Sequence, residues 1–334
     1  MQVTYFQRKP RPNANFSIEL VFEGVRRELA ERIDARVCVA PVCSDGLLPR
    51  LRIAWHARRH QGEINHVTGD TNFTALALDG KRTILTNLDC GYIVRTRGLR
   101  RWLLRRIWLQ LPVKHVAAVT TISTQIKEEI VHYTNCPPDK IHVIPVAVSP
   151  QFKPCSREFH TERPRILHLG TAPNKNLPRL IEAVTGLPCT LVIIGQLHDD
   201  VLRQLEQTGV VYENHLNLPA PDVVRQYEQS DLVAFVSLYE GFGVPILEAQ
   251  AVGRPVLTSN RLPMSDVAGE GACLVDPTDV KSIRGGIDCI MRDADFRGRL
   301  IESGFENVKL YQPQQIAQQY LALYEKVLAG ADRQ

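Results

Sequence analysis

Two glutamates flank a short glycine-rich turn in SLYEGFGVPILE, residues 237–248. The apolar run DLVAFVS (231–237) predicts a buried parallel strand, which places Glu240 at its carboxyl end, the edge where α/β proteins bind ligands. The glycines allow a tight turn, and Pro245 favours the first turn of a helix that carries Glu248. The start of such a helix suits a phosphate. We therefore predict an anion site here, with Glu248 accepting hydrogen bonds from a diol such as a ribose and Glu240 from a sugar.

A second anion signal lies in HLGTAPNKNLPRLIEA, residues 168–183. A predicted strand, a glycine and a polar loop lead to Lys175 at the start of a predicted helix. Lysine serves as a point charge for a diphosphate group. Because parallel strands end at the same edge of their sheet, we expect this loop and the 237–248 turn to face one site.

The elements that must position these loops alternate between short β-rich runs and helical stretches, the pattern of parallel α/β sheets. The proline-rich, charged segment 149–164 predicts a linker. We expect two Rossmann-like doubly wound domains, residues 1–150 and 151–312, with a ligand cleft between them, and a C-terminal segment 313–334 whose helix crosses back to the first domain. Strands are predicted at 3–6, 36–41, 64–69, 82–87, 117–123, 141–146, 165–170, 190–195, 231–237, 254–259 and 272–277. Helices of the first half are predicted at 16–33, 99–111 and 123–134, and a C-terminal helix at 313–329.

Three stretches resemble one family: TAPNKNLPRLIEA, SLYEGFGVPILEAQAVGRPV and LVDP (274–277). They look like the donor-binding domain of retaining GT-B glycosyltransferases, glycosyltransferase family 4, and the resemblance covers most of residues 140–330. It implies a GT-B fold and an enzyme that transfers a sugar from a UDP- or GDP-sugar, with retention of configuration and without a metal or other cofactor. The implied acceptor is a glycan, a lipid-linked sugar or another glycoconjugate, as in polysaccharide biosynthesis.

The resemblance also assigns residues. It makes Lys175 and Glu240 the catalytic candidates, the first at the leaving diphosphate and the second at the transferred sugar, and it places the ribose at Glu248. Preorganised positive charge at a departing oxygen is typically the largest catalytic contribution. The rest of the implied donor-binding set is Gly170, Thr171, Asn174, Phe242, Gly243, Val244 and Leu247.

The first half departs from the family pattern in its candidate residues. Leu88 stands where many members carry a histidine, and Asn87 or Asp89 are the candidates to replace it. The stretch RKPRPNANFSIE (8–19) lacks the glycine pair common in the first loop, and Asn174 stands where many members have a second basic residue. The candidate residues for the cleft side of this domain are Asn15, His66, Asp70 and Asp89. His66 ends a predicted strand beside Asp70, and a packed or surface role is the alternative for it.

The composition limits cofactors and compartment. Eight cysteines are scattered without a CxxC pair, which argues against a zinc site or a disulfide framework and favours reduced cytosol. The one DxD, residues 293–295, is predicted to be a surface turn, so no metal site is expected. No signal peptide is recognised, and no run reaches the ~18–20 apolar residues of a membrane span. We expect a cytoplasmic protein, at most peripheral at the inner face of the membrane.

Basic residues are concentrated in the first half of the chain. Residues 1–150 carry 22 Lys and Arg against 13 Asp and Glu, whereas residues 151–334 carry 18 against 23.

Six arginines lie between positions 95 and 106. Helical spacing predicts one core-facing side and one arginine-rich side from which Trp108 protrudes beside Leu104, a combination suited to an anionic membrane or a lipid-linked acceptor. A solvated face, or packing of Trp108 on a neighbouring helix, are the alternatives. Nucleic acid is not expected, because no recognition motif accompanies the arginines. The core-facing side is predicted to hold Leu99, Trp102, Leu103, Ile107 and Leu109, and the membrane or acceptor face Arg100, Arg101, Arg105 and Trp108.

Other functions fit the sequence less well. A glycoside hydrolase would use Glu240 and Glu248 as its carboxylate pair, but this leaves the lysine loop without a role. A non-catalytic subunit that binds nucleotide sugars stays open, because Leu88 replaces the family histidine. A dinucleotide oxidoreductase is excluded by the lack of a GxGxxG motif at the start of either half.

Overall fold

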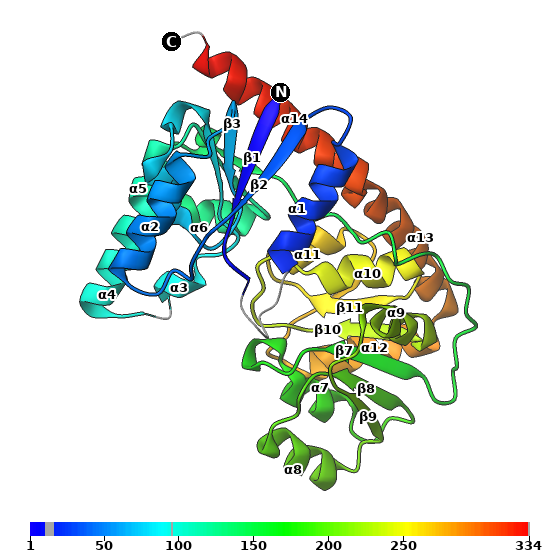
Figure 1. The fold of residues 1–334 in the computed structure, drawn as a ribbon. Helices are drawn as coiled ribbons and strands as arrows, with labels where there is room; N and C mark the ends of the chain where they lie inside the picture. The colour runs from blue at the N-terminus through cyan, green and yellow to red at the C-terminus, as the bar shows by residue number, and fades with distance from the viewer. Residues whose placement is uncertain (11–16, 95, 333–334) are drawn as a thin grey trace. The chain divides into compact units, whose positions relative to one another are not determined.

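A computed structural model describes residues 1–10, 17–94 and 96–332 of the chain. The chain divides into two compact units: Met1–Ala147 together with Pro313–Gln334, and Val148–Gln312. Each unit contains one six-stranded sheet in which every pairing is parallel. Two doubly wound α/β units confirm the predicted fold class (Figure 1).

The sheet of the first unit has the order β2-β1-β3-β4-β5-β6. Its strands are β1 (Gln2–Gln7), β2 (Asp34–Val39), β3 (Ile64–Val67), β4 (Thr83–Thr86), β5 (Ala118–Thr121) and β6 (Ile141–Val143). Its α-helices are α1 (Ser17–Glu28), α2 (Leu47–Arg58), α3 (Gly91–Val94), α4 (Gly98–Leu103), α5 (Leu111–His115), α6 (Thr124–Thr134) and α14 (Pro313–Ala331). A π-helical segment, η3 (Leu104–Gln110), joins α4 to α5, and the short 3₁₀ turns are η1 (Asn72–Ala77), η2 (Gly80–Arg82) and η4 (Pro138–Lys140).

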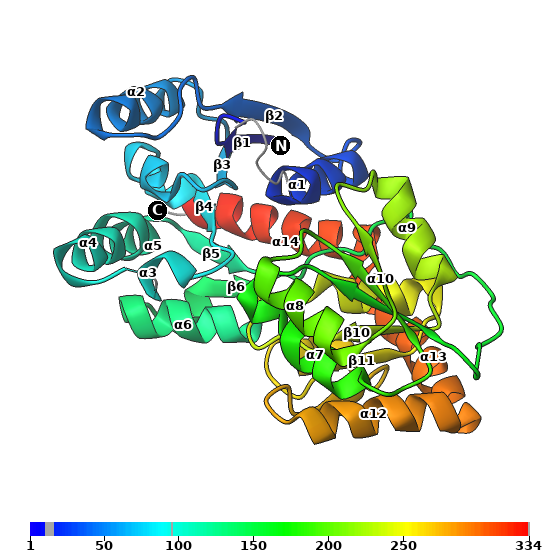
Figure 2. The same cartoon turned by 90° about the horizontal axis from the view of Figure 1, so that it is seen from below.

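Alternating side chains along the strands divide the first unit into two cores, because neighbouring residues of a strand face opposite sides of the sheet. Tyr5 and Ile84 pack with α1 and α14 on one side, whereas Phe6 and Leu85 pack with α5 and α6 on the other. The C-terminal helix α14 is therefore part of the core of the unit in which the chain begins. Figures 1 and 2 show α14 (red) running along α1 and across the first sheet.

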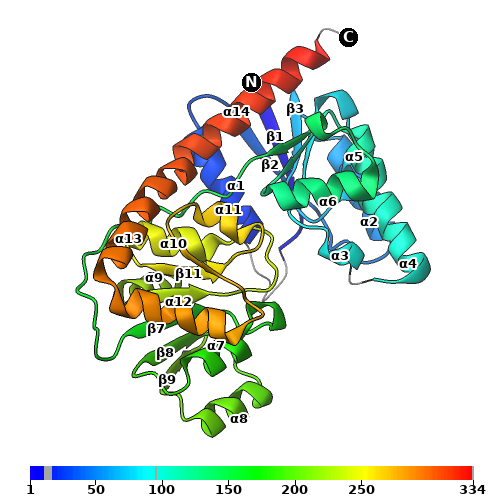
Figure 3. The ribbon, with the colours of Figure 1, turned by 180° about the vertical axis from the view of Figure 1, so that it is seen from behind.

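The sheet of the second unit has the order β12-β11-β10-β7-β8-β9. Its strands are β7 (Arg165–Leu169), β8 (Thr190–Ile194), β9 (Tyr212–His215), β10 (Leu232–Phe235), β11 (Val256–Ser259) and β12 (Cys273–Val275). Its α-helices are α7 (Leu177–Val184), α8 (Asp199–Thr208), α9 (Ala220–Gln229), α10 (Val244–Val252), α11 (Met264–Ala268), α12 (Val280–Arg292) and α13 (Ala294–Val308). The 3₁₀ turns are η5 (Pro173–Lys175) and η6 (Lys309–Tyr311). Figure 3 shows α12 and α7 side by side over one face of this sheet, where both contribute to its main core.

Three features differ from the sequence-based expectations. Helix α2 and the edge strand β9 were not predicted: α2 leaves several leucines exposed, and β9 has the polar sequence YENH. The single helix expected at 99–111 is divided into α4, η3 and α5.

Candidate functional site

The strand order of the second sheet decides where its loops can bind a ligand. The central strands β7 and β10 are neighbours, but the chain continues from β7 towards β8 and from β10 towards β11, on opposite sides. Loops leave such a switch point in opposite directions, and this opens a crevice at the carboxyl ends of the two strands. The predicted lysine loop follows β7 and the predicted glutamate turn follows β10, so topology alone brings them together.

Lys175 is held over the loop that precedes it. Gly170 has a positive φ of 87°, and a Cβ there would lie 3.0 Å from Lys175 Cε, so the lysine side chain occupies the space that glycine leaves open. Its ammonium group lies 4.8 Å from the ring centroid of Phe235 at the end of β10. These contacts hold the positive charge at the carboxyl ends of β7 and β10.

Glu240 meets this charge directly. Lys175 Nζ donates to Glu240 Oε1 at 2.8 Å, and both side chains are mostly shielded from solvent, being 21% and 15% exposed. Asn174 Nδ2 donates to the same carboxylate oxygen at 3.3 Å and to the Tyr239 carbonyl at 3.0 Å. The backbone joins the loops as well, because Leu238 N donates to the Asn174 carbonyl at 2.7 Å. The two loops are therefore joined by hydrogen bonds between both their side chains and their backbones.

The turn after Glu240 ends at a helix start. Gly243, with a φ of 120°, caps α10, and Pro245 lies in its first turn. The leading N–H groups of an α-helix have no partner within the helix and carry its positive end, so α10 offers an anion site beside the lysine loop. The side chains of Phe242 and Leu247 are both buried in the second unit, and Phe242 packs on Tyr311. Their contribution to a ligand site is limited to backbone groups.

Glu248 lies in α10 and is partly buried. Tyr227 in α9 donates its hydroxyl hydrogen to Glu248 Oε2 at 2.5 Å. Burial raises the pKa of Glu248 above its ordinary value, and the Tyr227 hydrogen bond partly opposes this rise. Tyr227 therefore orients one oxygen of a carboxylate whose charge is incompletely solvated, an arrangement that favours additional donors such as ligand hydroxyl groups.

Asn176 supports the lysine loop, although the sequence analysis quoted it without giving it a role. It is buried, has a left-handed φ of 63°, and starts α7 directly after the lysine. Its Nδ2 donates to the Val236 carbonyl at 3.0 Å and to the Pro277 carbonyl at 2.7 Å. It therefore pins the end of the lysine loop to the strand that carries the glutamate turn. The signal that could have found it is the pair of asparagines around Lys175, since asparagine tolerates the left-handed conformation.

Thr171 and Val244 are the remaining donor-side candidates. Thr171 lies in the same loop, where its hydroxyl donates to the Gln196 carbonyl at 2.6 Å, and Val244 is a half-exposed residue at the first position of α10. The predicted surface turn at 293–295 is a helix cap, because Asp293 accepts from Phe296 N at 2.8 Å.

The candidates of the first unit do not form one cluster. Asp70 and Asp89 line one pocket of about 200 Å³ together with Arg8 and Leu88. Asn15 lies outside the described residues. His66 is fully buried, so its prediction as a cleft residue is wrong.

His66 belongs to a buried polar chain. Its Nδ1 lies 2.8 Å from the Tyr324 hydroxyl and its Nε2 2.7 Å from Thr86 Oγ1. Tyr324 donates onward to Tyr5 at 3.1 Å, so Nδ1 carries the hydrogen and Nε2 accepts from Thr86. Burial lowers the pKa of His66 to about 3, which keeps the ring neutral. The residue therefore holds α14 to the sheet.

The arginine-rich segment agrees only in part with the prediction: Leu109 is buried and Arg100 and Arg101 are exposed as expected, but the two tryptophans are not where they were predicted. Trp108 is only 8% exposed and packs on Phe73, with Arg50 of α2 stacked on its ring at 4.8 Å. The expectation that Trp108 protrudes is therefore wrong, and the stated alternative, packing on a neighbouring helix, is confirmed. Trp102, expected in the core, is 59% exposed, and Leu103 and Ile107 are exposed beside it. The physical reason is η3, whose wide i→i+5 turns change the angle between successive side chains and shift the faces that an α-helical pattern assigns.

Arg100, Arg101 and Arg106 are also exposed, whereas Arg105 is part-buried and donates from Nε to the Tyr133 carbonyl at 2.9 Å. Among the described residues, no helix combines the length and the apolar character needed to cross a bilayer.

Two family models match consecutive parts of the chain. The model described as Glycosyltransferase Family 4 matches residues 3–152, and the one described as Glycosyl transferases group 1 matches residues 153–307. The boundary between the matches lies close to the boundary at Ala147 and Val148 in the structure.

Curated relatives are glycosyltransferases as well. The O-antigen chain mannosyltransferase B of Escherichia coli is 28% identical over 62% of this chain and 60% of its own length. The MMP alpha-(1->4)-mannosyltransferase of Mycolicibacterium hassiacum is 27% identical over 69% of this chain and 59% of its own length. The chain thus matches about three fifths of each of these relatives.

Solved structures share the fold over nearly the whole chain. Alr3699/HepE of Anabaena, solved in complex with UDP, has a TM-score of 0.78 at 14% identity and covers 98% of this chain and 100% of its own. A glycosyltransferase of Rickettsia africae has a TM-score of 0.76 at 17% identity, covering 98% of this chain and 99% of its own. With the two family matches, which together cover residues 3–307, the chain belongs to the group 1 glycosyltransferases of glycosyltransferase family 4.

Proposed function

We propose that this protein transfers a sugar from a nucleoside diphosphate sugar, with UDP or GDP as the carrier, to a glycan or lipid-linked acceptor. The observation that carries the proposal is the Lys175–Glu240 ion pair, 2.8 Å long, at the β7–β10 switch point beside the start of α10. A diphosphate fits here because an ammonium group and a helix start supply positive charge on adjacent loops. Lys175 has three N–H donors, so its bond to Glu240 leaves two for phosphate oxygens.

The chemistry requires stabilisation of a leaving group. The bond between the anomeric carbon and the diphosphate oxygen breaks, and its electron pair stays on the diphosphate, where Lys175 and the α10 start stabilise the new charge. An acceptor hydroxyl forms the new bond to the anomeric carbon, and its proton passes to the departing phosphate. We propose attack from the same face, hence retention, and no metal at this step, as the family resemblance implies.

The glutamates recognise the two sugars of the donor in this proposal. Glu248, oriented by Tyr227, accepts from the ribose hydroxyls, and Glu240 accepts from the transferred sugar while it positions Lys175. Mannose is our first choice for the transferred sugar, because two relatives are named mannosyltransferases.

The alternatives explain less of this geometry. For a glycoside hydrolase, the two carboxylates would act as a pair across a sugar. Here Glu240 is held by Lys175, whereas Glu248 is held by Tyr227. A non-catalytic binding subunit would use the same donor site, so catalysis has to be measured separately from binding.

Calorimetry with UDP and GDP tests the binding half of the proposal. One of them should bind, and Lys175→Ala and Glu248→Ala should weaken it at least about tenfold, the loss of a charge-assisted contact. Lys281→Ala, an exposed lysine of the same unit, is the matched control and should bind as the natural chain does. If no nucleoside diphosphate binds, the proposal is refuted.

Donor hydrolysis and transfer test the catalytic half. A screen that begins with mannosyl donors should show turnover that persists in EDTA and gives a product with the donor's anomeric configuration by NMR. Glu240→Gln should bind UDP or GDP but lose turnover. Nucleotide binding without turnover of any donor would favour the non-catalytic alternative.

We further propose a peripheral location, with the first unit bound to an anionic membrane on the cytoplasmic side. Exposed apolar side chains accompany exposed arginines on α4 and η3, and α2 packs against η3 through Arg50 and Trp108. Apolar side chains among arginines suit the interface of an anionic bilayer. The exposed apolar residues are Leu47, Leu48, Leu51 and Trp55 on α2, and Trp102, Leu103 and Ile107 on α4 and η3.

Vesicle co-sedimentation tests this location. Binding to vesicles with anionic phosphatidylglycerol should exceed binding to neutral ones and weaken with salt, because the arginine contribution is screened. Trp102→Ala combined with Trp55→Ala should reduce binding, whereas Leu310→Ala, an exposed apolar residue of the other unit, should not. Equal sedimentation of both variants would refute this surface.

A further inference from the structure

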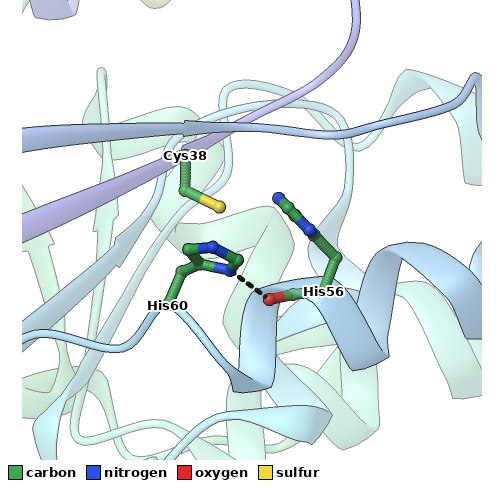
Figure 4. A group of neighbouring side chains, drawn as sticks. All are labelled: Cys38, His56 and His60. Atoms are coloured by element: carbon green, nitrogen blue, oxygen red, sulfur yellow. Dashed lines mark hydrogen bonds between the residues drawn. The ribbon is translucent and has the colours of Figure 1, made fainter.

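A cysteine and two histidines meet at one edge of the first sheet. Cys38 lies near the end of the edge strand β2, His56 in the last turn of α2, and His60 two residues beyond α2. The Cys38 sulfur and one ring nitrogen of each histidine all lie within 4.8 Å of one another. Figure 4 shows both rings beside the Cys38 sulfur, between the strand and the helix.

The local structure fixes one of the rings. His60 Nδ1 lies 2.8 Å from the His56 carbonyl oxygen, which can only accept, so Nδ1 carries the hydrogen and Nε2 keeps a free lone pair. A backbone carbonyl bonded to the second ring nitrogen is the usual support of a metal-binding histidine. The turn that ends α2 keeps the two rings close, with ring centroids 4.3 Å apart.

The chemistry of the three groups suits a zinc-class ion. Two imidazole nitrogens and one thiol sulfur are donor types that zinc prefers in proteins. Cys38 would bind as a thiolate, so an ion bound here would displace the thiol proton to solvent.

We propose that Cys38, His56 and His60 bind one zinc-class divalent ion, with Cys38 Sγ and His60 Nε2 as two of three ligands and a fourth position open to water. Tetrahedral zinc with bonds of about 2.0–2.3 Å separates its ligand atoms by about 3.3–3.6 Å, so atoms within 4.8 Å of one another need to approach by at most about 1.5 Å. A mixed sulfur and imidazole set selects zinc over magnesium or calcium. The ion would clip the edge strand β2 to the end of α2.

The site was not predicted from the sequence, because Cys38 lies 18 and 22 residues before the two histidines and no CxxC pair is present. The spacing H-x-x-x-H in WHARRH (55–60) was the available signal. The proposal is independent of the glycosyl-transfer site, since every ligand belongs to the first unit.

Metal titration of the full chain, after treatment with EDTA, tests the proposal. Co²⁺ should bind one equivalent and give the ligand-field bands of a tetrahedral ion with a thiolate charge-transfer band, and Zn²⁺ should remove both. Cys38→Ser should abolish the thiolate band, and His60→Ala should weaken binding at least about tenfold. The controls Cys43→Ala and His132→Ala, in the same unit, should bind as the natural chain does.

Thermal melting provides a second readout that needs no spectrum. Saturating Zn²⁺ should raise the melting temperature of the natural chain and of both controls, but not of Cys38→Ser or His60→Ala. A thiolate band that persists in Cys38→Ser, or an equal zinc-induced shift in His60→Ala, would overturn the assignment. So would the absence of a one-equivalent Co²⁺ complex in the natural chain.

Discussion

Asn176 offers the most direct test of how the donor loop is held in place. Replacement by glycine removes two buried hydrogen bonds of the side-chain amide, to the Val236 and Pro277 carbonyls, and a part-buried one that Oδ1 accepts from Arg179, but it keeps the left-handed backbone accessible. At about 1 kcal/mol for each buried bond, and up to about 1 kcal/mol for the entropy of glycine, Asn176→Gly should cost about 2–3 kcal/mol. Asn176→Ala loses the same bonds and must also adopt a positive φ, which should bring its cost to about 3–4 kcal/mol.

The assay can separate the two units. All three tryptophans, Trp55, Trp102 and Trp108, lie in the first unit, so their fluorescence follows that unit, whereas circular dichroism follows both. In urea, the Asn176 variants should shift the dichroism transition and leave the tryptophan transition in place if the units unfold separately.

Binding of UDP or GDP should weaken in both variants, because the pinned residue follows Lys175 directly. Two results would refute the reasoning. A loss of less than about 1 kcal/mol in the free energy of unfolding for Asn176→Gly would show that the side-chain hydrogen bonds of Asn176 do not hold the loop. An alanine variant as stable as the glycine variant would show that the positive φ is not required.

Three further perturbations test other parts of the structure. Burial raises the pKa of Glu248, so its ionised form is less favourable in the folded chain than in the unfolded one. Glu248→Gln should therefore have a higher melting temperature than the natural chain at pH 7, measured by circular dichroism. This difference in melting temperature should disappear as the pH falls below the pKa of glutamate in the unfolded chain, near 4.5. A difference that does not change with pH contradicts the reasoning. Gly170→Ala and Gly186→Ala impose a similar positive-φ strain, but only the new Cβ at position 170 meets Lys175. Calorimetry should therefore find weaker nucleotide binding for Gly170→Ala alone. An equal loss of affinity in both variants would argue against the contact with Lys175. Tyr324→Phe leaves the buried histidine of β3 without one partner and should destabilise the first unit by about 1–3 kcal/mol in tryptophan-monitored urea unfolding, whereas an unchanged midpoint would deny its role.

The donor-side loops were predictable because their positions follow from periodicity alone. A buried apolar run places Glu240 at a strand end, and a second run places the lysine loop at the end of another strand, so the parallel sheet brings the two together. Asn176 has no such pattern. Its function depends on two carbonyls that lie 60 and 101 residues further along the chain, and local sequence contains no information on contacts of that range.

The errors in the first unit have local and distant causes. The faces of residues 95–108 were assigned at α-helical spacing, and η3 breaks that spacing within seven residues. His66 was expected near a ligand because it ends a strand beside Asp70. Its true partner, Tyr324, lies 258 residues away on α14.

The return of the chain into its first unit has a consequence for synthesis. Residues 148–312 form the second unit without interruption, so this unit can fold as soon as it leaves the ribosome. The first unit must wait, because Ile316, Tyr320 and Tyr324 of α14 belong to its core and follow the whole second unit in the chain. During that interval the apolar faces of β1 and α1 lack their cover. The unit in which the chain begins is therefore completed after the unit that follows it.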